Sequence, residues 1–329
     1  MTITRLKIRA KPVNCINRVK GLTSGATIPI SSDATIRVNI ELLSIKNELL
    51  SGTIANSNAQ WISSKITQAG GLVKRITTVG DSISEISAAA KESIQRNPDW
   101  LIISGGLGPT YDDKTLQGLS TALGQELALD PVALEMLRKS YARNPSTRNY
   151  ELNDIRLKMA KIPRGSVPIQ NPVGSAPSVI IKNTNSNNPN SKTRIVCLPG
   201  VPKEMKAVFS NTIMPQLKIT IGDYFFAGSV FETIGISESM LAPTLSSIVD
   251  SYPVDAIYLK THPRGYGLET SNKHKIKPKL NIQIVSKGKE KVQVKKRYND
   301  ILDALTSEIG RLGGKIYLAN AKRMKSNKL

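Results

Sequence analysis

The chain has 329 residues, enough for about two domains at roughly 100–200 residues each. Its 40% hydrophobic content and mean hydropathy of -0.19 are typical of a folded globular protein, and no segment approaches the about 20 apolar residues that span a bilayer. Two cysteines and two histidines are too few for a disulfide framework or a Cys/His zinc site. We therefore expect a cytoplasmic protein that does not enter a membrane.

The net charge of +21 suggests nucleic acid, so its distribution along the chain matters. Residues 1–37 carry a net charge of +6 and residues 260–329 carry +13, whereas residues 38–259 carry only +2. The composition of residues 1–37 predicts a disordered basic extension, and residues 321–329 are a basic tail. The neutral centre, and a C-terminal part without an aromatic-rich strand pair, argue against nucleic acid as the partner.

Residues 38–123 repeat a strand, a loop and a helix three times. The predicted strands are short and apolar, and they cover Val38–Ser44, Leu72–Thr78 and Trp100–Ser104. Apolar residues at helical spacing follow each strand, after the N-cap cluster Asn56-Ser57-Asn58, the capping box Ser82-x-x-Glu85 and the loop Gly105–Asp113. This alternation predicts an α/β fold with a doubly wound, mostly parallel sheet, whose ligand binds beyond the carboxyl ends of the strands.

The remaining sequence predicts two more strands of this sheet and then a smaller α+β unit. The elements are strands at Ser178–Lys182 and Thr193–Leu198, a helix through Met205–Ile213, a strand at Phe225–Ile234, a helix at Ser237–Asp250, strands at Ala256–Thr261 and Leu280–Val285, and a helix through Ile301–Ile309. We therefore expect an extension at 1–37, a larger domain at 38–220, a small α+β domain at 221–320 and a tail at 321–329.

The loop Gly105–Asp113 is the strongest local signal for a ligand site. Three glycines, a proline, a threonine and two carboxylates fall within nine residues, between an apolar strand and a helix. Backbone N–H groups in a glycine-rich turn approach an anion closely, and a helix N-terminus attracts negative charge. The loop matches neither a dinucleotide fingerprint nor a Walker loop. It predicts a phosphate site formed by Gly105, Gly106, Gly108 and Thr110.

Acidic side chains at the same edge of the sheet are candidates for holding a cation. Asp113 and Asp81 follow strands that we expect to be neighbours, and each has an alternative role as a helix N-cap. Asp112 and Glu48 are further carboxylates at this edge. Because carboxylates and phosphate oxygens are the usual ligands of magnesium, we predict that Asp81 and Asp113 bind a divalent cation, magnesium or a transition metal.

Other polar residues have simpler interpretations. Lys203 and Glu204 open a helix after a Pro-Gly turn, where an exposed charge pair is usually solvated. A lone histidine such as His262 is more often a surface residue than an anion contact. Cys197 lies in an apolar strand with no histidine nearby in the sequence, which predicts a core residue rather than a nucleophile.

Six short segments, in this order and at these spacings, carry a resemblance to a known family. They are Asn47-Glu48-Leu49-Leu50-Ser51-Gly52, Asn56-Ser57-Asn58-Ala59, Val79-Gly80-Asp81, Gly105-Gly106-Leu107-Gly108-Pro109-Thr110 with Asp112-Asp113-x-Thr115, Asn171-Pro172-Val173-Gly174-Ser175-Ala176-Pro177, and Leu198-Pro199-Gly200-Val201-Pro202-Lys203-Glu204-Met205. The chain resembles the N-terminal domain of CinA (competence/damage-inducible) proteins, members of the MoaB/Mog-like molybdopterin-binding superfamily. Gly235–Ser239 is similar to the start of the small middle domain of CinA proteins.

The resemblance implies a three-layer α/β fold and a metal-dependent ADP-ribose pyrophosphatase that yields AMP and ribose 5-phosphate. Asp81, Asp112, Asp113 and Glu48 are then the candidate catalytic residues, with Asp81 and Asp113 on the metal and Asp112 or Glu48 orienting water. The candidate ligand-binding residues are Asn47, Asn58, Gly105, Gly106, Gly108, Thr110, Thr115, Pro199, Gly200, Lys203 and Glu204.

The alternative is a molybdopterin-binding protein or molybdopterin adenylyltransferase, for which molybdopterin would be the ligand. The glycine loop has the Gly-Gly-Leu-Gly-Pro-Thr form of CinA rather than the Gly-Gly-Thr-Gly form of the adenylyltransferases, which favours the pyrophosphatase. The sequence ends near where the nicotinamide-nucleotide deamidase domain of CinA would begin, so we expect no deamidase activity. Relatives in the superfamily lead us to expect a homo-oligomer that acts on a small phosphorylated nucleotide.

Overall fold

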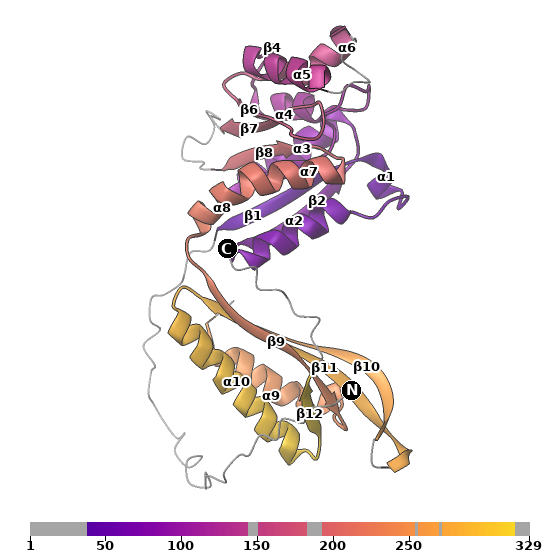
Figure 1. Ribbon diagram of the computed structural model, residues 1–329, viewed down its shortest axis with the longest axis vertical. Helices are drawn as coiled ribbons and strands as arrows, with labels where there is room; N and C mark the ends of the chain where they lie inside the picture. The colour runs from indigo at the N-terminus through magenta and orange to yellow at the C-terminus, as the bar shows by residue number, and fades with distance from the viewer. Residues whose placement is uncertain (1–37, 144–150, 183–192, 254–255, 270–271, 320–329) are drawn as a thin grey trace. The chain divides into compact units, whose positions relative to one another are not determined.

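The computed structural model describes residues 38–143, 151–182, 193–253, 256–269 and 272–319. The predicted extension at 1–37 and the tail at 321–329 lie outside these residues. The two larger sheets are a mixed sheet built from residues 39–198 and an antiparallel sheet built from residues 225–318 (Figure 1), and residues 127–129 pair with 161–163 in a small two-stranded sheet. The mixed sheet has a hydrophobic core on each face, and the antiparallel sheet has a core of its own.

The mixed sheet has six strands. They are β1 (Asn39–Ile45), β2 (Leu72–Val79), β3 (Trp100–Ser104), β6 (Val167–Ile169), β7 (Ser178–Lys182) and β8 (Arg194–Leu198). Their order is β2-β1-β3-β8-β7-β6, in which β2, β1, β3 and β8 are parallel to one another while β7 is antiparallel to both of its neighbours. The prediction of a mostly parallel, doubly wound sheet is confirmed.

Helices cover both faces of this sheet, which gives three layers. One face packs against α3 (Ile83–Gln95), α4 (Thr115–Leu123) and α5 (Pro131–Arg143), and the other against α2 (Ser57–Gln68), α7 (Pro202–Val208) and α8 (Met214–Ile221). Successive residues of β1 alternate between the two cores, with Leu42 in one and Leu43 in the other. All five residues of β3 are buried, as expected for a strand covered on both faces.

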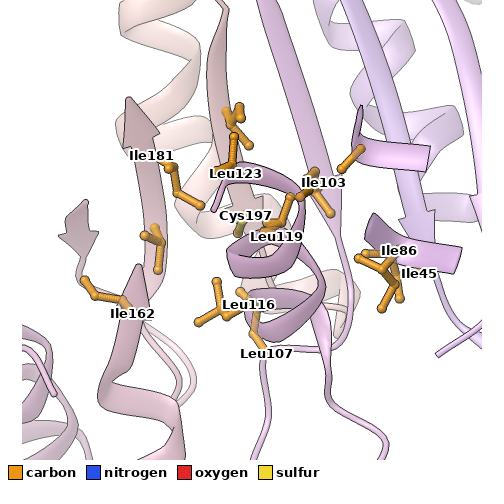
Figure 2. Close-up of a cluster of buried hydrophobic side chains, with 14 of the residues drawn as sticks. Ile45, Ile86, Ile103, Leu107, Leu116, Leu119, Leu123, Ile162, Ile181 and Cys197 are labelled. Atoms are coloured by element: carbon orange, nitrogen blue, oxygen red, sulfur yellow. The ribbon is translucent and has the colours of Figure 1, made fainter. Parts of the chain in front are cut away.

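Cys197 confirms the prediction of a core cysteine. It is fully buried in β8 beside Leu119 and other residues of α4 (Figure 2). Burial raises the pKa of its thiol, because an apolar environment disfavours the thiolate. The group is therefore protonated and inert at neutral pH.

The N-cap signals of two helices have different outcomes. Asn56 caps α2 as predicted, since its side-chain oxygen accepts a hydrogen bond from the N–H of Ala59 at 3.2 Å. The prediction of a capping box before α3 is wrong. Ser82 makes no capping hydrogen bond, and Glu85 instead accepts one from the N–H of Gly80 at 3.1 Å, which holds the loop after β2.

The strand order corrects one expectation about the site. We expected β2 and β3 to be neighbours, but β1 lies between them and pairs with both. The chain therefore reverses its direction of winding between β1 and β3. This arrangement is the topological switch point at which open α/β sheets bind ligands.

Several short elements and one helix were not predicted. They are α1 (Asn47–Leu50), β4 (Leu127–Leu129), helix α5, α6 (Asp154–Leu157), a 3-10 turn (Lys158–Ala160), β5 (Lys161–Pro163), strand β6 and a π-helical turn (Phe209–Ile213) between α7 and α8. The segment 46–52, expected to be only a turn, thus contains a single helical turn at the carboxyl end of β1.

The antiparallel sheet forms the expected α+β unit. Its elements follow one another as β9 (Phe225–Ile234), α9 (Glu238–Asp250), β10 (Ile257–Glu269), β11 (Asn272–Gly288), α10 (Lys291–Arg311) and β12 (Lys315–Leu318), and the strand order is β10-β11-β9-β12. This is a ferredoxin-like arrangement. Strands β10 and β11 are longer than predicted, and β12 was missed. Within the described segments, no helix is long and apolar enough to cross a membrane.

Candidate functional site

A cavity of about 620 Å³ opens at the carboxyl ends of β1 and β3. The loops after β1, β2, β3 and β8 all contribute to its wall. Ten of the predicted site residues line it, namely Asn58, Asp81, Gly105, Gly106, Gly108, Asp112, Asp113, Pro199, Gly200 and Glu204. The structure thus brings together residues separated by up to 146 positions of sequence, from Asn58 to Glu204.

The other predicted site residues lie behind or beside this wall. Thr115 is fully buried and donates a hydrogen bond from its hydroxyl to the carbonyl of Gly105 at 2.8 Å, so it supports the loop from below. Asn47 and Glu48 lie in α1, and Thr110 lies in the glycine loop. Lys203 is exposed at the start of α7 and does not line the cavity.

The glycine loop approaches its neighbours too closely for any side chain. A Cβ at Gly105, whose φ is +108°, would lie 2.2 Å from the carbonyl oxygen of Ile45. A Cβ at Gly106 would lie 2.3 Å from the hydroxyl of Thr115. The N–H of Gly105 is used in a hydrogen bond to Leu198, but those of Gly106, Leu107 and Gly108 donate to none of the described residues. These three groups are free to bind an anion in the cavity.

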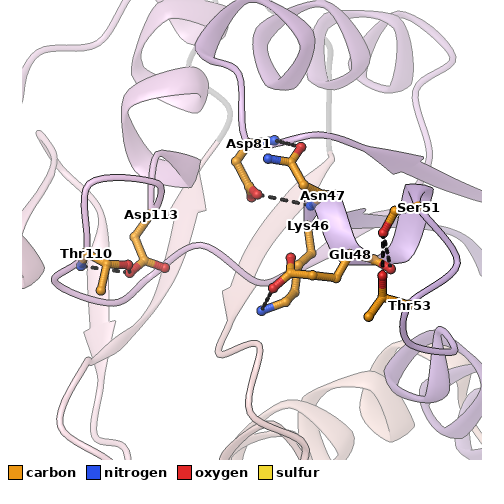
Figure 3. A network of polar contacts seen from close by, with 8 residues as sticks. All are labelled: Lys46, Asn47, Glu48, Ser51, Thr53, Asp81, Thr110 and Asp113. Carbon is orange, nitrogen blue, oxygen red and sulfur yellow. Dashed lines mark hydrogen bonds and ion pairs between the residues drawn. The ribbon is translucent and has the colours of Figure 1, made fainter.

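Asp81 is held by the backbone of α1 (Figure 3). One of its carboxylate oxygens accepts a hydrogen bond from the N–H of Asn47 at 3.0 Å, and the side-chain oxygen of Asn47 accepts one from the N–H of Asp81 at 3.2 Å. Burial raises the pKa of Asp81 most; the N–H of Asn47 opposes this shift, and the carboxylates of Asp112 and Glu48 add to it. Asp81 therefore lies in a partly buried and negatively charged surrounding.

Lys46, which the sequence did not single out, supplies the positive charge of this cluster. Its ammonium forms an ion pair with Glu48 at 3.0 Å (Figure 3). This contact raises the pKa of Lys46, and the nearby carboxylates of Asp81 and Asp112 add to the shift. Lys46 lines the cavity whereas Glu48 does not, so Glu48 orients the lysine from the side.

Asp113 has a structural role within the loop. One of its oxygens accepts hydrogen bonds from both the N–H of Thr110, at 3.0 Å, and the hydroxyl of Thr110, at 2.5 Å (Figure 3). Neither Asp112 nor Asp113 caps α4, because the N-cap residue is Lys114. The alternative interpretation of Asp113 as a helix N-cap is therefore wrong, and so is that of Asp81, because the N-cap residue of α3 is Ser82. The ammonium of Lys158 donates to the carbonyl of Thr110 at 2.6 Å, and burial lowers its pKa.

The arrangement of the carboxylates indicates whether a divalent cation could bind in the cavity. The described part of the chain contains no group of three or more His, Cys, Asp or Glu side chains that could hold a metal ion. Two carboxylates of the cavity wall do interact, because the charge of Asp112 contributes to the raised pKa of Asp81, and a cation would relieve this repulsion. Magnesium commonly binds one or two carboxylates together with phosphate oxygens and water. The site therefore fits a cation that arrives with a phosphorylated ligand.

Asn58 joins the loops that follow β1 and β8. Its side-chain nitrogen donates to the carbonyl of Gly200 at 2.8 Å. Its side-chain oxygen is buried and has no hydrogen-bond partner, although a buried acceptor without a donor costs free energy.

The segment 171–177 closes another part of the wall through Ser175 and Ala176. Glu204 accepts a hydrogen bond from the side chain of Asn171 at 2.7 Å, and the oxygen of Asn171 accepts one from the N–H of Gly174 at 2.8 Å. Glu204 thus fixes this segment against the start of α7. The prediction that these two residues form an exposed, solvated charge pair therefore holds for Lys203 but not for Glu204.

Fold and cavity together define an α/β protein with an open cavity at the switch point of a mostly parallel sheet. Residues 41–219 match the family described as "Probable molybdopterin binding domain", and the chain belongs to this family. The sequence prediction of a CinA-like domain in the MoaB/Mog-like superfamily is confirmed at this level.

Relatives from archaea extend over most of the chain. A protein of Sulfolobus acidocaldarius is 38% identical, and the alignment covers 84% of this chain and 96% of that protein. A protein of Sulfurisphaera tokodaii is 40% identical, and the alignment covers 84% of this chain and 97% of that protein. Among solved structures, the protein CinA of unknown function from Thermoplasma acidophilum is 37% identical, with a TM-score of 0.47 over 54% of this chain and 98% of that chain. The molybdopterin biosynthesis enzyme MoaB from Thermus thermophilus is 16% identical, with a TM-score of 0.35 over 55% and 96% of the two chains.

Proposed function

We propose that this chain is a metal-dependent nucleotide pyrophosphatase of CinA type, which hydrolyses ADP-ribose to AMP and ribose 5-phosphate. One observation carries the proposal. The cavity combines free backbone N–H groups, which bind anions, with charged side chains that are mostly acidic: Lys46 against Asp81, Asp112, Asp113 and Glu204. An anion alone would be repelled by four carboxylates. A phosphate accompanied by a cation satisfies both sets of groups.

The residues of the chain then have distinct tasks. The N–H groups of Gly106, Leu107 and Gly108 hold the pyrophosphate and stabilise the charge that develops as the bond between the phosphates breaks. Asn58 ties the loop after β8 to the start of α2 at the cavity wall, through its hydrogen bond to the carbonyl of Gly200.

Asp81 and Asp112 are the residues that would hold the cation. A bound divalent cation would neutralise the phosphate oxygens and acidify a water molecule. This assignment differs from the sequence hypothesis in one residue, because Asp113 uses a carboxylate oxygen to shape the loop around Thr110. Lys46 adds a fixed positive charge beside the reacting phosphates, and Glu48 keeps its ammonium in place.

Metal-free protein incubated with ADP-ribose, then with magnesium, manganese or cobalt, tests the proposal. Mass spectrometry should detect AMP and ribose 5-phosphate only when a metal is present. Asp81→Asn and Asp112→Asn should each lower kcat/KM at least 100-fold with an unchanged melting temperature. Glu135→Gln, which removes an exposed carboxylate on α5, is the matched control and should leave the rate unchanged. Hydrolysis that persists in Asp81→Asn, or no hydrolysis with any metal, would refute the proposal.

The family match supports a second candidate, a molybdopterin-binding or adenylyl-transferring protein. The same N–H groups and carboxylates would then hold the phosphate of molybdopterin or the phosphates of ATP. A panel with ADP-ribose, ATP and molybdopterin separates the two functions, because only the second predicts AMP transfer from ATP to the pterin phosphate.

A further inference from the structure

Among the described residues, α9 and α10 cover the antiparallel sheet on one face only (Figure 1). Side chains from these two helices form a single core with Phe231 of β9 and with Leu280, Ile282 and Ile284 of β11. Residues between these in sequence point to the opposite face. We call this opposite face the outer sheet face and define it by Phe226, Val230, Glu232, Tyr258, Lys260, Lys279, Lys315 and Tyr317.

Three aromatic side chains from three strands lie on the outer sheet face. Phe226 is 39% exposed, Tyr258 is 45% exposed and Tyr317 is 48% exposed. Tyr258 of β10 lies across from Val285 of β11, which in turn lies across from Gly228 of β9, so the side chain beside this tyrosine is a small aliphatic one and the next position has none. Exposed rings provide surfaces on which planar groups can stack.

The charges of the outer sheet face are mostly positive. Lys260, Lys279 and Lys315 project from β10, β11 and β12, and Arg264 reaches the side-chain oxygen of Asn281 at 2.9 Å. Among the residues that define this face, Glu232 is the one acidic side chain, and it pairs with Lys279 at 3.6 Å. The helix α10, by contrast, mixes both signs.

We propose that the outer sheet face binds single-stranded nucleic acid. Bases would stack on Tyr258 and Tyr317 while the lysines neutralise phosphates. These two tyrosines lie on the two edge strands, three strand spacings or about 14 Å apart across the sheet, so one base cannot contact both and the ligand is extended. The sequence argued against nucleic acid because the C-terminal part has no aromatic-rich strand pair; the sheet brings aromatic residues of three different strands to one face.

Fluorescence anisotropy of the full chain tests this proposal. The probes are labelled 16-nucleotide RNA and DNA of the same mixed sequence, measured at several salt concentrations, with inorganic polyphosphate as a competitor that has no bases. Tyr258→Ala should weaken binding about 5- to 100-fold. Replacing Lys260 and Lys315 with Gln should reduce the slope of log affinity against log salt by about 1.4. The RNA and DNA arms show which polymer is preferred.

The basic residues outside the sheet could also attract a polyanion, so a matched control is essential. Lys296→Glu on α10 changes the charge as much as Lys260→Glu does, but on the helical side of the sheet. We expect Lys260→Glu to weaken binding at least tenfold and Lys296→Glu less than twofold, with equal melting temperatures. Equal losses in the two variants, full affinity in Tyr258→Ala, or no binding of either polymer would overturn the proposal. The proposal would also be overturned if sedimentation showed that the variants change the oligomeric state of the protein while their affinity for the probe stays the same.

Discussion

A buried ion pair fastens the strand that carries the site to a neighbouring helix. Glu41 of β1 is only 6% exposed and accepts three short contacts: from Nε of Arg96 at 2.9 Å, from Nη2 of Arg96 at 2.7 Å and from the hydroxyl of Ser93 at 2.7 Å. Ser93 belongs to α3 and Arg96 is its C-cap residue. The pair therefore fixes the end of α3 against the amino-terminal half of β1.

Arg96→Met would leave the carboxylate buried with a single hydrogen bond. Breaking a buried ion pair on one side costs about 3–5 kcal/mol, and because the side chain of Arg96 is 32% exposed we expect about 3 kcal/mol at neutral pH. The double variant Glu41→Leu with Arg96→Met removes both charges and should lose much less. Lys139→Met, which breaks the exposed pair with Glu135, should cost under about 0.5 kcal/mol.

The pH dependence of this loss distinguishes an ion pair from simple packing. Burial alone would raise the pKa of Glu41, but the hydrogen bonds from Arg96 and Ser93 outweigh it and hold the pKa below its ordinary value of 4.5. The pair therefore stabilises the native state above about pH 4.5, and its contribution is lost as the pH falls through the lowered pKa. In Arg96→Met the carboxylate has a raised pKa, so acid should shrink the difference from wild type.

Urea unfolding followed by tryptophan fluorescence measures this difference. Trp61 and Trp100 are the two tryptophans of the chain, and both pack in the core of the mixed sheet. The reasoning fails if Arg96→Met loses less than about 1 kcal/mol at pH 7, or if its loss is the same at pH 4 as at pH 7. It also fails if the double variant is as unstable as Arg96→Met.

Three further changes probe the site. Gly105→Ala should destabilise the fold by at least about 2 kcal/mol, because the new Cβ would lie 2.2 Å from the carbonyl oxygen of Ile45 at a φ of +108°. A melting temperature within about 2 °C of the wild-type value would contradict this expectation. Thr115→Val should cost about 1–3 kcal/mol, measured by urea unfolding, since it leaves the buried carbonyl of Gly105 without its donor. Lys46→Met should raise the pKa of Asp81 further and move the acidic limb of the pH–rate profile to higher pH; an unmoved limb would exclude the two residues from a common cluster.

Local sequence signals were sufficient for most of the core elements. The apolar run of β3 and the Asn56 cap of α2 were both read correctly, because hydrophobic periodicity and capping act over a few residues. Helix α5 was missed because most of its residues face away from the core and only Ala133, Leu137 and Ser140 are buried. Strands β10 and β11 extend beyond their apolar stretches into polar residues, where pairing of the two backbones, rather than a buried face, maintains the strand.

The composition of the site was predictable, but its internal contacts were not. Ten of the residues singled out in the sequence line the cavity, since most of them lie next to a strand end or a glycine turn. It could not separate Asp112 from Asp113, because only the folded loop shows that Asp113 turns back onto Thr110. Lys158 approaches the same loop from 48 residues away, and no spacing rule connects two such positions.

The strand order explains why these carboxylates can act together. Asp81 and Asp112 follow β2 and β3, which are separated by β1, so two acidic loops converge over the end of the central strand rather than side by side. Lys46, the first residue after β1, then lies between them and reduces their repulsion in the absence of a ligand. A cation that enters with a phosphate would take over this task and leave Lys46 free to contact the phosphate. The small net charge of +2 over residues 38–259 thus conceals a cavity whose charged lining residues are mostly acidic.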